Sequence, residues 1–199
     1  MTAHLIITAD DLGYHPRYDA GILEAVAAGA IDAVSVMVLR IEAPPPLPEG
    51  SGPALGLHLE PGDPIGQLER FESLIGREPD YLDGHRHCHA TATVTALAAE
   101  RGLPVRSIDA AHRRALRAAG VRTPDRLIGR YREADPVLPP ELGALPPGWT
   151  EWMVHPGHPA GGRFSSYDAG REQDLEALLE LELPEGVNRS DQRSLPPPP

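Results

Sequence analysis

The sequence lacks several features on which common functions depend. Its 199 residues include one cysteine, Cys88, which excludes an internal disulfide framework and fits a reducing compartment. It has no lysine, so its 18 basic residues are all arginine; they face 29 acidic residues, for a net charge of −11. This acidic excess argues against nonspecific binding to nucleic acid or to anionic membranes. The apolar run at 5–8 is too short for a signal peptide or a membrane span, and no later run approaches the required length. We therefore expect a soluble, cytoplasmic protein.

The length fits one domain with a real hydrophobic core. We expect that domain to cover residues 1–187. The remaining residues, 188–199, end in four consecutive prolines and are predicted to form a disordered or polyproline tail.

Apolar runs and helical periodicities alternate along the chain. Strands are predicted at 4–9, 34–39, 54–59, 80–84, 103–107 and 151–155, and helices at 16–29, 66–76, 90–101, 111–119, 124–132 and 174–182. This alternation favours a parallel α/β architecture.

Polar residues follow several of the predicted strands at the point where each strand ends. Asp10 and Asp11 follow the first strand, His58 ends the third, the segment 83–89 leaves the fourth and His155 ends the last. Catalytic residues of parallel α/β folds collect at the carboxyl ends of strands, so these groups are predicted to converge on one site.

Asp11, His58 and His85 form a plausible metal site of two histidines and one carboxylate, which leaves positions open for water and substrate. Asp10 is then the natural general base and His155 the natural general acid. Taken alone, an Asp-Asp pair is more often a turn or helix cap, and a lone histidine on an apolar strand is more often a core residue.

The segment Asp-Gly-His-Arg-His-Cys-His at 83–89 is harder to explain without a function. Strand spacing would put His85, His87 and His89 on one side, and such histidine-rich tracts usually bind metal or handle protons. Cys88 has the opposite strand parity, and we interpret it as buried and not ligating.

Four segments carry a family resemblance: Ile-Thr-Ala-Asp-Asp-Leu-Gly at 7–13, Gly-Leu-His-Leu at 56–59, Leu-Asp-Gly-His-Arg-His-Cys-His at 82–89 and Val-His-Pro-Gly at 154–157. In these segments and their order, the chain resembles the YdjC/ChbG-like carbohydrate (chitooligosaccharide) deacetylases, from the first strand to about residue 183. The resemblance implies a deformed TIM-like (β/α) barrel, related to polysaccharide-deacetylase-type barrels. It also implies an amide hydrolase that removes the acetyl group from N-acetylated sugars.

Carried over to the matching positions, the resemblance implies that Asp11, His58 and His85 hold one divalent metal ion, with Asp10 as base and His155 as acid. His87 and His89 match later histidines of the family motif; they are interpreted as groups that line the pocket or orient ligands, and core packing is nearly as plausible. Arg106 is expected to pair with Asp10 and tune its basicity, although an ordinary structural ion pair is an equal alternative.

The family is commonly assigned Mg²⁺, whereas two imidazoles favour Zn²⁺, Mn²⁺ or Co²⁺, and both expectations stay open. The chain is also shorter than typical members, because only 26 residues separate His58 from His85. We expect this shortened barrel to lack a barrel helix or a substrate-facing loop. A more open cleft, or one completed by a second subunit in a homodimer, would follow.

Two other functions remain open at this point. One is a degenerate barrel that binds metal or carbohydrate without catalysis, and the other is a metal-dependent hydrolase of another small substrate. A phosphoester hydrolase is disfavoured, since the sequence has no glycine-rich phosphate-binding loop.

Overall fold

The computed structural model describes residues 2–48, 52–130, 135, 137–161 and 165–198. Its strands are β1 (Ala3–Leu12), β2 (Ala33–Val36), β3 (Ala54–Leu59), β4 (Leu82–Gly84), β5 (Arg126–Gly129), β6 (Gly148–Val154) and β7 (Val187–Arg189). Its α-helices are α1 (Pro16–Ala27), α2 (Pro64–Ile75), α3 (Ala92–Arg101), α4 (Ala110–Ala118) and α5 (Asp168–Leu179). Three short 3₁₀ helices are η1 (His85–His87), η2 (Pro140–Ala144) and η3 (Gln192–Ser194).

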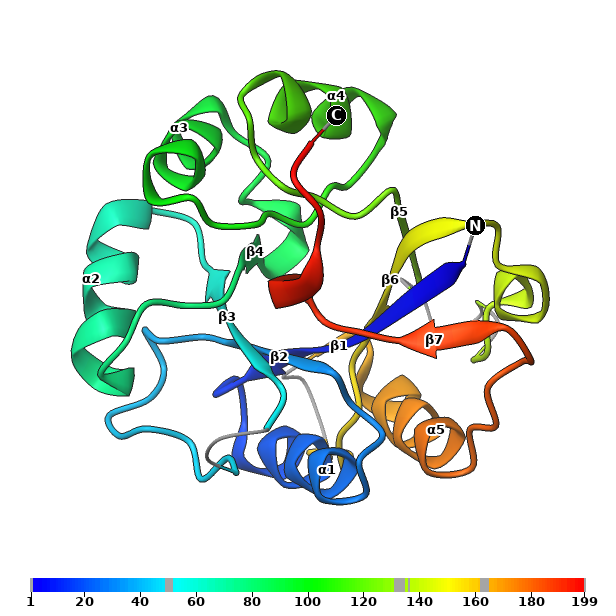
Figure 1. Cartoon of the computed structure of the whole chain (residues 1–199). Coiled ribbons are helices and arrows are strands. Elements are labelled where there is room, and N and C mark those ends of the chain that lie inside the picture. The colour runs from blue at the N-terminus through cyan, green and yellow to red at the C-terminus, as the bar shows by residue number, and fades with distance from the viewer. Residues whose placement is uncertain (1, 49–51, 131–134, 136, 162–164, 199) are drawn as a thin grey trace.

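The strands form one parallel sheet in the order β4-β3-β2-β1-β6-β5, and β7 pairs with the first residues of β1. The sheet curls into a half-barrel with the helices around its outside (Figure 1). This arrangement confirms the expected deformed and shortened TIM-like barrel. Among the described residues, no helix has both the length and the apolar character needed to cross a membrane.

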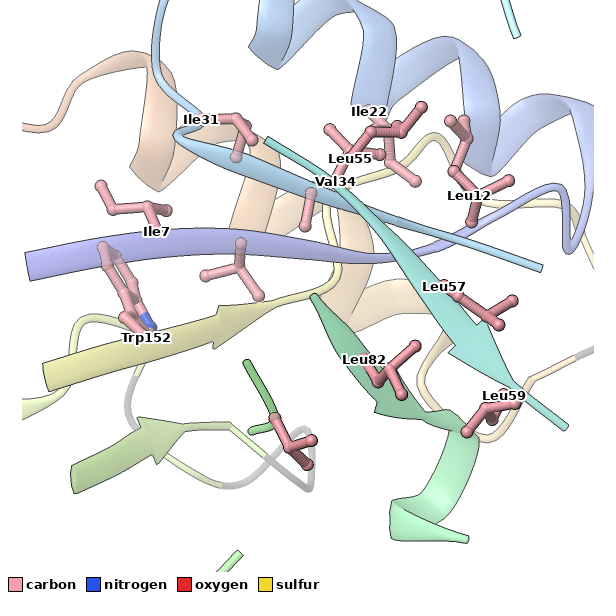
Figure 2. Packing of buried hydrophobic residues seen from close by; sticks show 14 of the residues in the cluster. Ile7, Leu12, Ile22, Ile31, Val34, Leu55, Leu57, Leu59, Leu82 and Trp152 are labelled. Atoms are coloured by element: carbon pink, nitrogen blue, oxygen red, sulfur yellow. The ribbon is translucent and has the colours of Figure 1, made fainter. Parts of the chain in front are cut away.

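Both faces of the curled sheet are covered. Ile7, Val34 and Leu57 belong to the main hydrophobic cluster, which fills the space between strands and helices (Figure 2). A smaller cluster fills one end of the barrel interior and contains Ile6, Ala33, Ala54, Tyr81 and Leu195. The alternation of side chains along a strand separates the two clusters: Ile6 points into the barrel and Ile7 toward the helices.

Local signals in the sequence begin and end the helices. In α2, the Asp63 side chain accepts a hydrogen bond from the Ile65 N–H (3.0 Å) and Pro64 occupies the first turn. The helix ends at Gly76, whose φ of 81° is readily adopted only by glycine. The 26-residue connection after His58 thus still contains helix α2 and strand β4, which follow β3.

Several predicted elements are corrected. The helix predicted at 124–132 is wrong: the chain forms strand β5 there, and residues 131–132 lie outside the described part. The predicted strand at 103–107 makes only one bridge, between Val105 and Leu82. Helix α5 begins at Asp168, six residues before the predicted start at 174.

The segment 188–199, expected to be a disordered or polyproline tail, instead contributes to the folded domain. Residue 188 lies inside β7, and Gln192 and Leu195 are buried. Leu195 belongs to the small cluster inside the barrel, so this segment covers one end of the barrel interior. The last residue of the predicted tail, 199, lies outside the described residues.

Candidate active site and metal centre

A cavity of about 340 Å³ opens at the carboxyl ends of the strands, within the size range of small-molecule sites. The residues predicted to act together line it: Asp10, Asp11, His58, His85, His87 and His155. These residues come from β1, β3, the segment after β4 and the end of β6. The structure therefore brings the predicted residues of four strand ends to one cavity.

Backbone conformation explains how two consecutive aspartates reach the same cavity. Neighbouring side chains on a regular strand point to opposite faces. Here the pairing of β1 with β2 shifts register between Ala9 and Leu12, and Asp11 has a φ of 72°. This left-handed conformation is uncommon for residues other than glycine, although aspartate adopts it more often than most, and such residues cluster at functional sites. It turns the Asp11 carboxylate toward the cavity that Asp10 also lines.

The two predicted histidine ligands lie against Asp11. Asp11 Oδ1 is 2.9 Å from His85 Nδ1 and 3.3 Å from His58 Nε2. The ligand atoms of the three residues all lie within 4.8 Å of one another, so this group could hold a metal ion. Burial alone would raise the pKa of Asp11, but hydrogen bonds from His58 and His85 keep it well below its usual range.

The other nitrogen of His58 is fixed by Asp83. Asp83 Oδ1 lies 2.8 Å from His58 Nδ1, and both side chains are almost completely buried. A carboxylate at Nδ1 holds the proton there, so a metal that displaced the Nε2 proton would find the Nε2 lone pair available, a common arrangement behind metal-binding histidines. Asp83 belongs to the sequence motif at 82–89, but the sequence alone does not indicate this role.

Asp10 is held by a buried arginine. Arg106 Nη1 and Nη2 donate to Asp10 Oδ2 and Oδ1, both at 2.7 Å, which is the bidentate geometry of strong arginine–carboxylate pairs. The same guanidinium lies 2.8 Å from Asp83 and 2.9 Å from Glu151. The expected pairing of Arg106 with Asp10 is therefore present, as part of a network that sequence reasoning did not include.

The charges of this network support the fit of a divalent cation. Four carboxylates, from Asp10, Asp11, Asp83 and Glu151, face two guanidiniums, from Arg106 and Arg171. Buried charges of one sign need compensation. A divalent ion between Asp11 and the two histidines would offset part of this negative charge, and its donor set of one oxygen and two imidazoles is typical of such sites.

His155 lies immediately after β6 on another wall of the cavity. Its backbone N–H donates to Asp174 Oδ2 (3.0 Å), and its ring makes an edge contact with Tyr167 (centroids 5.5 Å apart). Burial lowers the pKa of His155, although the nearby carboxylates of Asp11 and Asp10 oppose this shift. The ring therefore tends to be neutral.

The histidine-rich segment does not continue as a strand. After Gly84 the chain turns into η1, with left-handed φ values of 51° at Arg86 and 62° at His87. The predicted alternation that would align His85, His87 and His89 is therefore wrong. His87 lines the cavity, whereas His89 is fully buried and its Nε2–H donates to the Arg106 carbonyl (3.0 Å).

Cys88, in the same segment, is half-buried, and its Sγ–H donates to the Leu59 carbonyl (3.0 Å). Burial raises the pKa of the Cys88 thiol, which disfavours the thiolate that a metal would require.

Sequence reasoning missed one wall of the cavity. Arg171 of α5 donates from Nη2 to Asp11 Oδ2 (2.6 Å), and Arg130, Met153, Ser165 and Tyr167 also line this wall. None of these residues lies within the four sequence motifs at 7–13, 56–59, 82–89 and 154–157. Arg171 lies in a polar stretch before the apolar pattern of α5 and resembles an ordinary solvent-exposed arginine in the sequence.

The fold and this site define a curled α/β barrel with a candidate metal centre of one aspartate and two histidines. The sequence profile of the YdjC-like protein family matches residues 4–60 and 65–189, so the chain belongs to this family. The resemblance inferred from the four motifs is thereby confirmed.

Curated relatives carry a consistent name. A carbohydrate deacetylase from Mus musculus is 30% identical, over 83% of this chain and 83% of its own length. A carbohydrate deacetylase from Homo sapiens is 29% identical, over 78% and 75%. A chitooligosaccharide deacetylase from Escherichia fergusonii is 27% identical, over 53% of this chain and 60% of its own length.

A crystal structure from Enterococcus faecalis V583, described only provisionally as a cellobiose-phosphate cleavage protein, has the same fold. Its TM-score is 0.73 at 23% identity, covering 98% of this chain and 99% of the other.

Proposed function

We propose that this protein is a metal-dependent hydrolase that removes the acetyl group from an N-acetylated sugar of the chitooligosaccharide type. One observation carries the proposal: the ligand atoms of Asp11, His58 and His85 converge within 4.8 Å, in a cavity that also contains Asp10 held by Arg106. The names of the relatives, carbohydrate deacetylases and a chitooligosaccharide deacetylase, supply the reaction and the class of substrate.

Asp11, His58 and His85 would hold one divalent ion. When bound, such an ion lowers the pKa of a water molecule and polarises the carbonyl oxygen of an amide. Zn²⁺, Mn²⁺ and Co²⁺ suit two imidazoles and a carboxylate, whereas Mg²⁺ prefers an all-oxygen set and is the family's usual assignment.

Asp10 is the general base in this proposal, because it is an ionisable carboxylate next to the ligand set without belonging to it. The bidentate pair with Arg106 fixes both of its oxygens in position beside the ligand set. A carboxylate held there can accept a proton from water.

His155 is the general acid, since it reaches the same cavity from the far side of β1 and can protonate the departing nitrogen. Its lowered pKa makes its imidazolium a stronger acid but leaves less of it protonated at neutral pH. His87, which lines the cavity, is proposed to contact the sugar, and His89 to hold the Arg106 backbone in place.

Acetate release from N,N′-diacetylchitobiose tests the function. The protein is stripped of metal, and Mg²⁺, Zn²⁺, Mn²⁺ or Co²⁺ is added back singly. We expect acetate only with metal, and the Asp10→Asn variant to lose turnover while it binds metal as the wild type does.

Asp109→Asn is the matched control. Asp109 caps α4 through the His112 N–H (2.7 Å), a role that asparagine also fills, so this variant should keep full activity. An active Asp10→Asn variant would overturn the assignment of the base. Stoichiometric metal binding without acetate release would favour a protein that binds metal without catalysing hydrolysis, or an enzyme that acts on another acylated substrate.

A further inference from the structure

The two oxygens of Asp11 have different partners. Oδ1 faces both candidate histidine ligands, 2.9 Å from His85 Nδ1 and 3.3 Å from His58 Nε2. Oδ2 accepts a hydrogen bond from Arg171 Nη2 at 2.6 Å. One oxygen is therefore directed at the candidate metal position, and the other is bound to a fixed cation.

Arg171 is held firmly for this contact. It is 2% exposed, and its guanidinium carbon lies 3.9 Å from the centroid of the Tyr18 ring. The Tyr18 hydroxyl in turn donates to Asp168 Oδ1 (2.7 Å), at the start of the helix that carries Arg171. The stacking and the ion pair together leave the guanidinium little room to turn away from Asp11.

The backbone near Arg171 is fixed as well. The Gly157 N–H donates to the Arg171 carbonyl (3.1 Å). Gly157 can lie there because Gly21 of α1 has no side chain: a Cβ at Gly21 would be 2.5 Å from the Gly157 Cα. The close approach of α1, the segment after His155 and α5 thus sets the position of Arg171 relative to β1.

A carboxylate can bind a metal through one oxygen or through both. Hydrolytic metal sites need open coordination positions for water and substrate, and a second carboxylate oxygen would occupy one of them. An arginine bound to the second oxygen disfavours this, because its charge-assisted hydrogen bond competes with the metal for that oxygen and its positive charge repels the ion.

We propose that Arg171 is a positioning residue that restricts Asp11 to one metal-binding oxygen and so keeps a coordination position open. The proposal rests on the proposed function only in requiring a divalent metal at Asp11, His58 and His85. It does not depend on the identity of the substrate.

The Co²⁺-loaded protein provides the test, because Co²⁺ absorbs visible light more strongly with four or five ligands than with six. In Arg171→Met, Asp11 is free to bind through both oxygens. We expect the visible absorption per bound Co²⁺ to fall about twofold or more while Co²⁺ still binds at least as tightly. Deacetylation should fall about tenfold or more, the usual effect of losing a group that orients a metal ligand.

Two further variants distinguish the positioning of Asp11 by Arg171 from a general effect on the folded structure. In Arg171→Lys, the ammonium group still donates to Asp11, so the Co²⁺ spectrum should remain close to that of the wild type. Arg130→Met removes another buried arginine of the same cavity wall, one that pairs with Asp174 (3.6 Å) on α5, and it should leave the spectrum unchanged.

An Arg171→Met protein that binds Co²⁺ with the wild-type spectrum would overturn the proposal. Equal losses of Co²⁺ affinity in Arg171→Met and Arg171→Lys would also overturn it, because they would show a merely structural role. If the wild type binds Co²⁺ but releases no acetate, the proposed reaction fails, while the spectra still decide the role of Arg171. A wild type that binds no Co²⁺ refutes both proposals.

Discussion

Asp83 offers the sharpest test of how the candidate metal site is supported. Its Oδ1 accepts from His58 Nδ1 (2.8 Å), while its Oδ2 accepts from Ser35 Oγ (2.6 Å) and lies 2.8 Å from Arg106 Nη2. Both oxygens therefore face donors. In Asp83→Asn, one oxygen becomes an NH₂ group, so a donor must face another donor on one of the two sides.

Either orientation of the new amide disturbs the site. With the NH₂ toward His58, the ring must accept at Nδ1 and carry its proton on Nε2, where the metal would bind. With the NH₂ toward Arg106, the guanidinium that holds Asp10 loses a partner. Loss of such a partner behind a metal-binding histidine typically weakens metal binding about 10- to 100-fold, or about 1.4 to 2.7 kcal/mol.

Metal affinity is measured by titrating metal-stripped protein with Zn²⁺ against a chromophoric chelator. Asp80→Asn is the control, because Asp80 lies three residues earlier and accepts from the Leu55 N–H (2.7 Å) and from Arg77 (3.1 Å). This control should bind Zn²⁺ as the wild type does. A folded Asp83→Asn protein with wild-type Zn²⁺ affinity would refute the reasoning.

Three further predictions concern stability and are measured by urea unfolding. Leu195→Ala should lose about 2 to 5 kcal/mol, because Leu195 is 4% exposed in the barrel interior; a freely moving tail would give no change. Gly56→Ala should lose about 1 to 3 kcal/mol or more, since its Cβ would lie 2.2 Å from Tyr81 Cζ, whereas Gly143→Ala meets nothing within 4 Å and should be neutral. Burial lowers the pKa of His89 from 6.5 to about 4, so the unfolded chain binds this proton more readily. The free energy of unfolding should therefore fall as the pH drops, by about 2 kcal/mol between pH 7 and pH 5. His89→Gln should remove that part of the pH dependence.

The sequence was sufficient to predict the elements whose side chains follow a clear pattern. β1 and β3 contain apolar runs, β6 contains an apolar stretch at 152–154 and α2 has a cap at each end, and these elements form close to their predicted positions. β5 was predicted as a helix because it has only four residues, and all four are half-buried, so no apolar alternation marks it.

Some residues of the candidate site could likewise be predicted from the sequence, and others could not. The strand-end rule was enough to bring Asp10, Asp11, His58 and His155 to one cavity. Of their partners, Arg106 was predicted for Asp10, but Asp83, Glu151 and Arg171 could not be found in the sequence. Arg171 lies 160 residues from Asp11, and only the packing of α5 against α1 brings them together.

The connection between His58 and His85 shows which parts of the fold the candidate metal site needs. The alignment with the mouse relative spans 256 positions, more than the 199 residues of this chain, so that relative contains segments absent here. Yet α2 still joins β3 to β4, and the Asp11, His58 and His85 ligand atoms still converge. They converge because β1, β2, β3 and β4 are consecutive neighbours in one parallel sheet, whose carboxyl ends lie at one edge whatever the length of the loops between them. The shorter chain therefore keeps the candidate ligand set together.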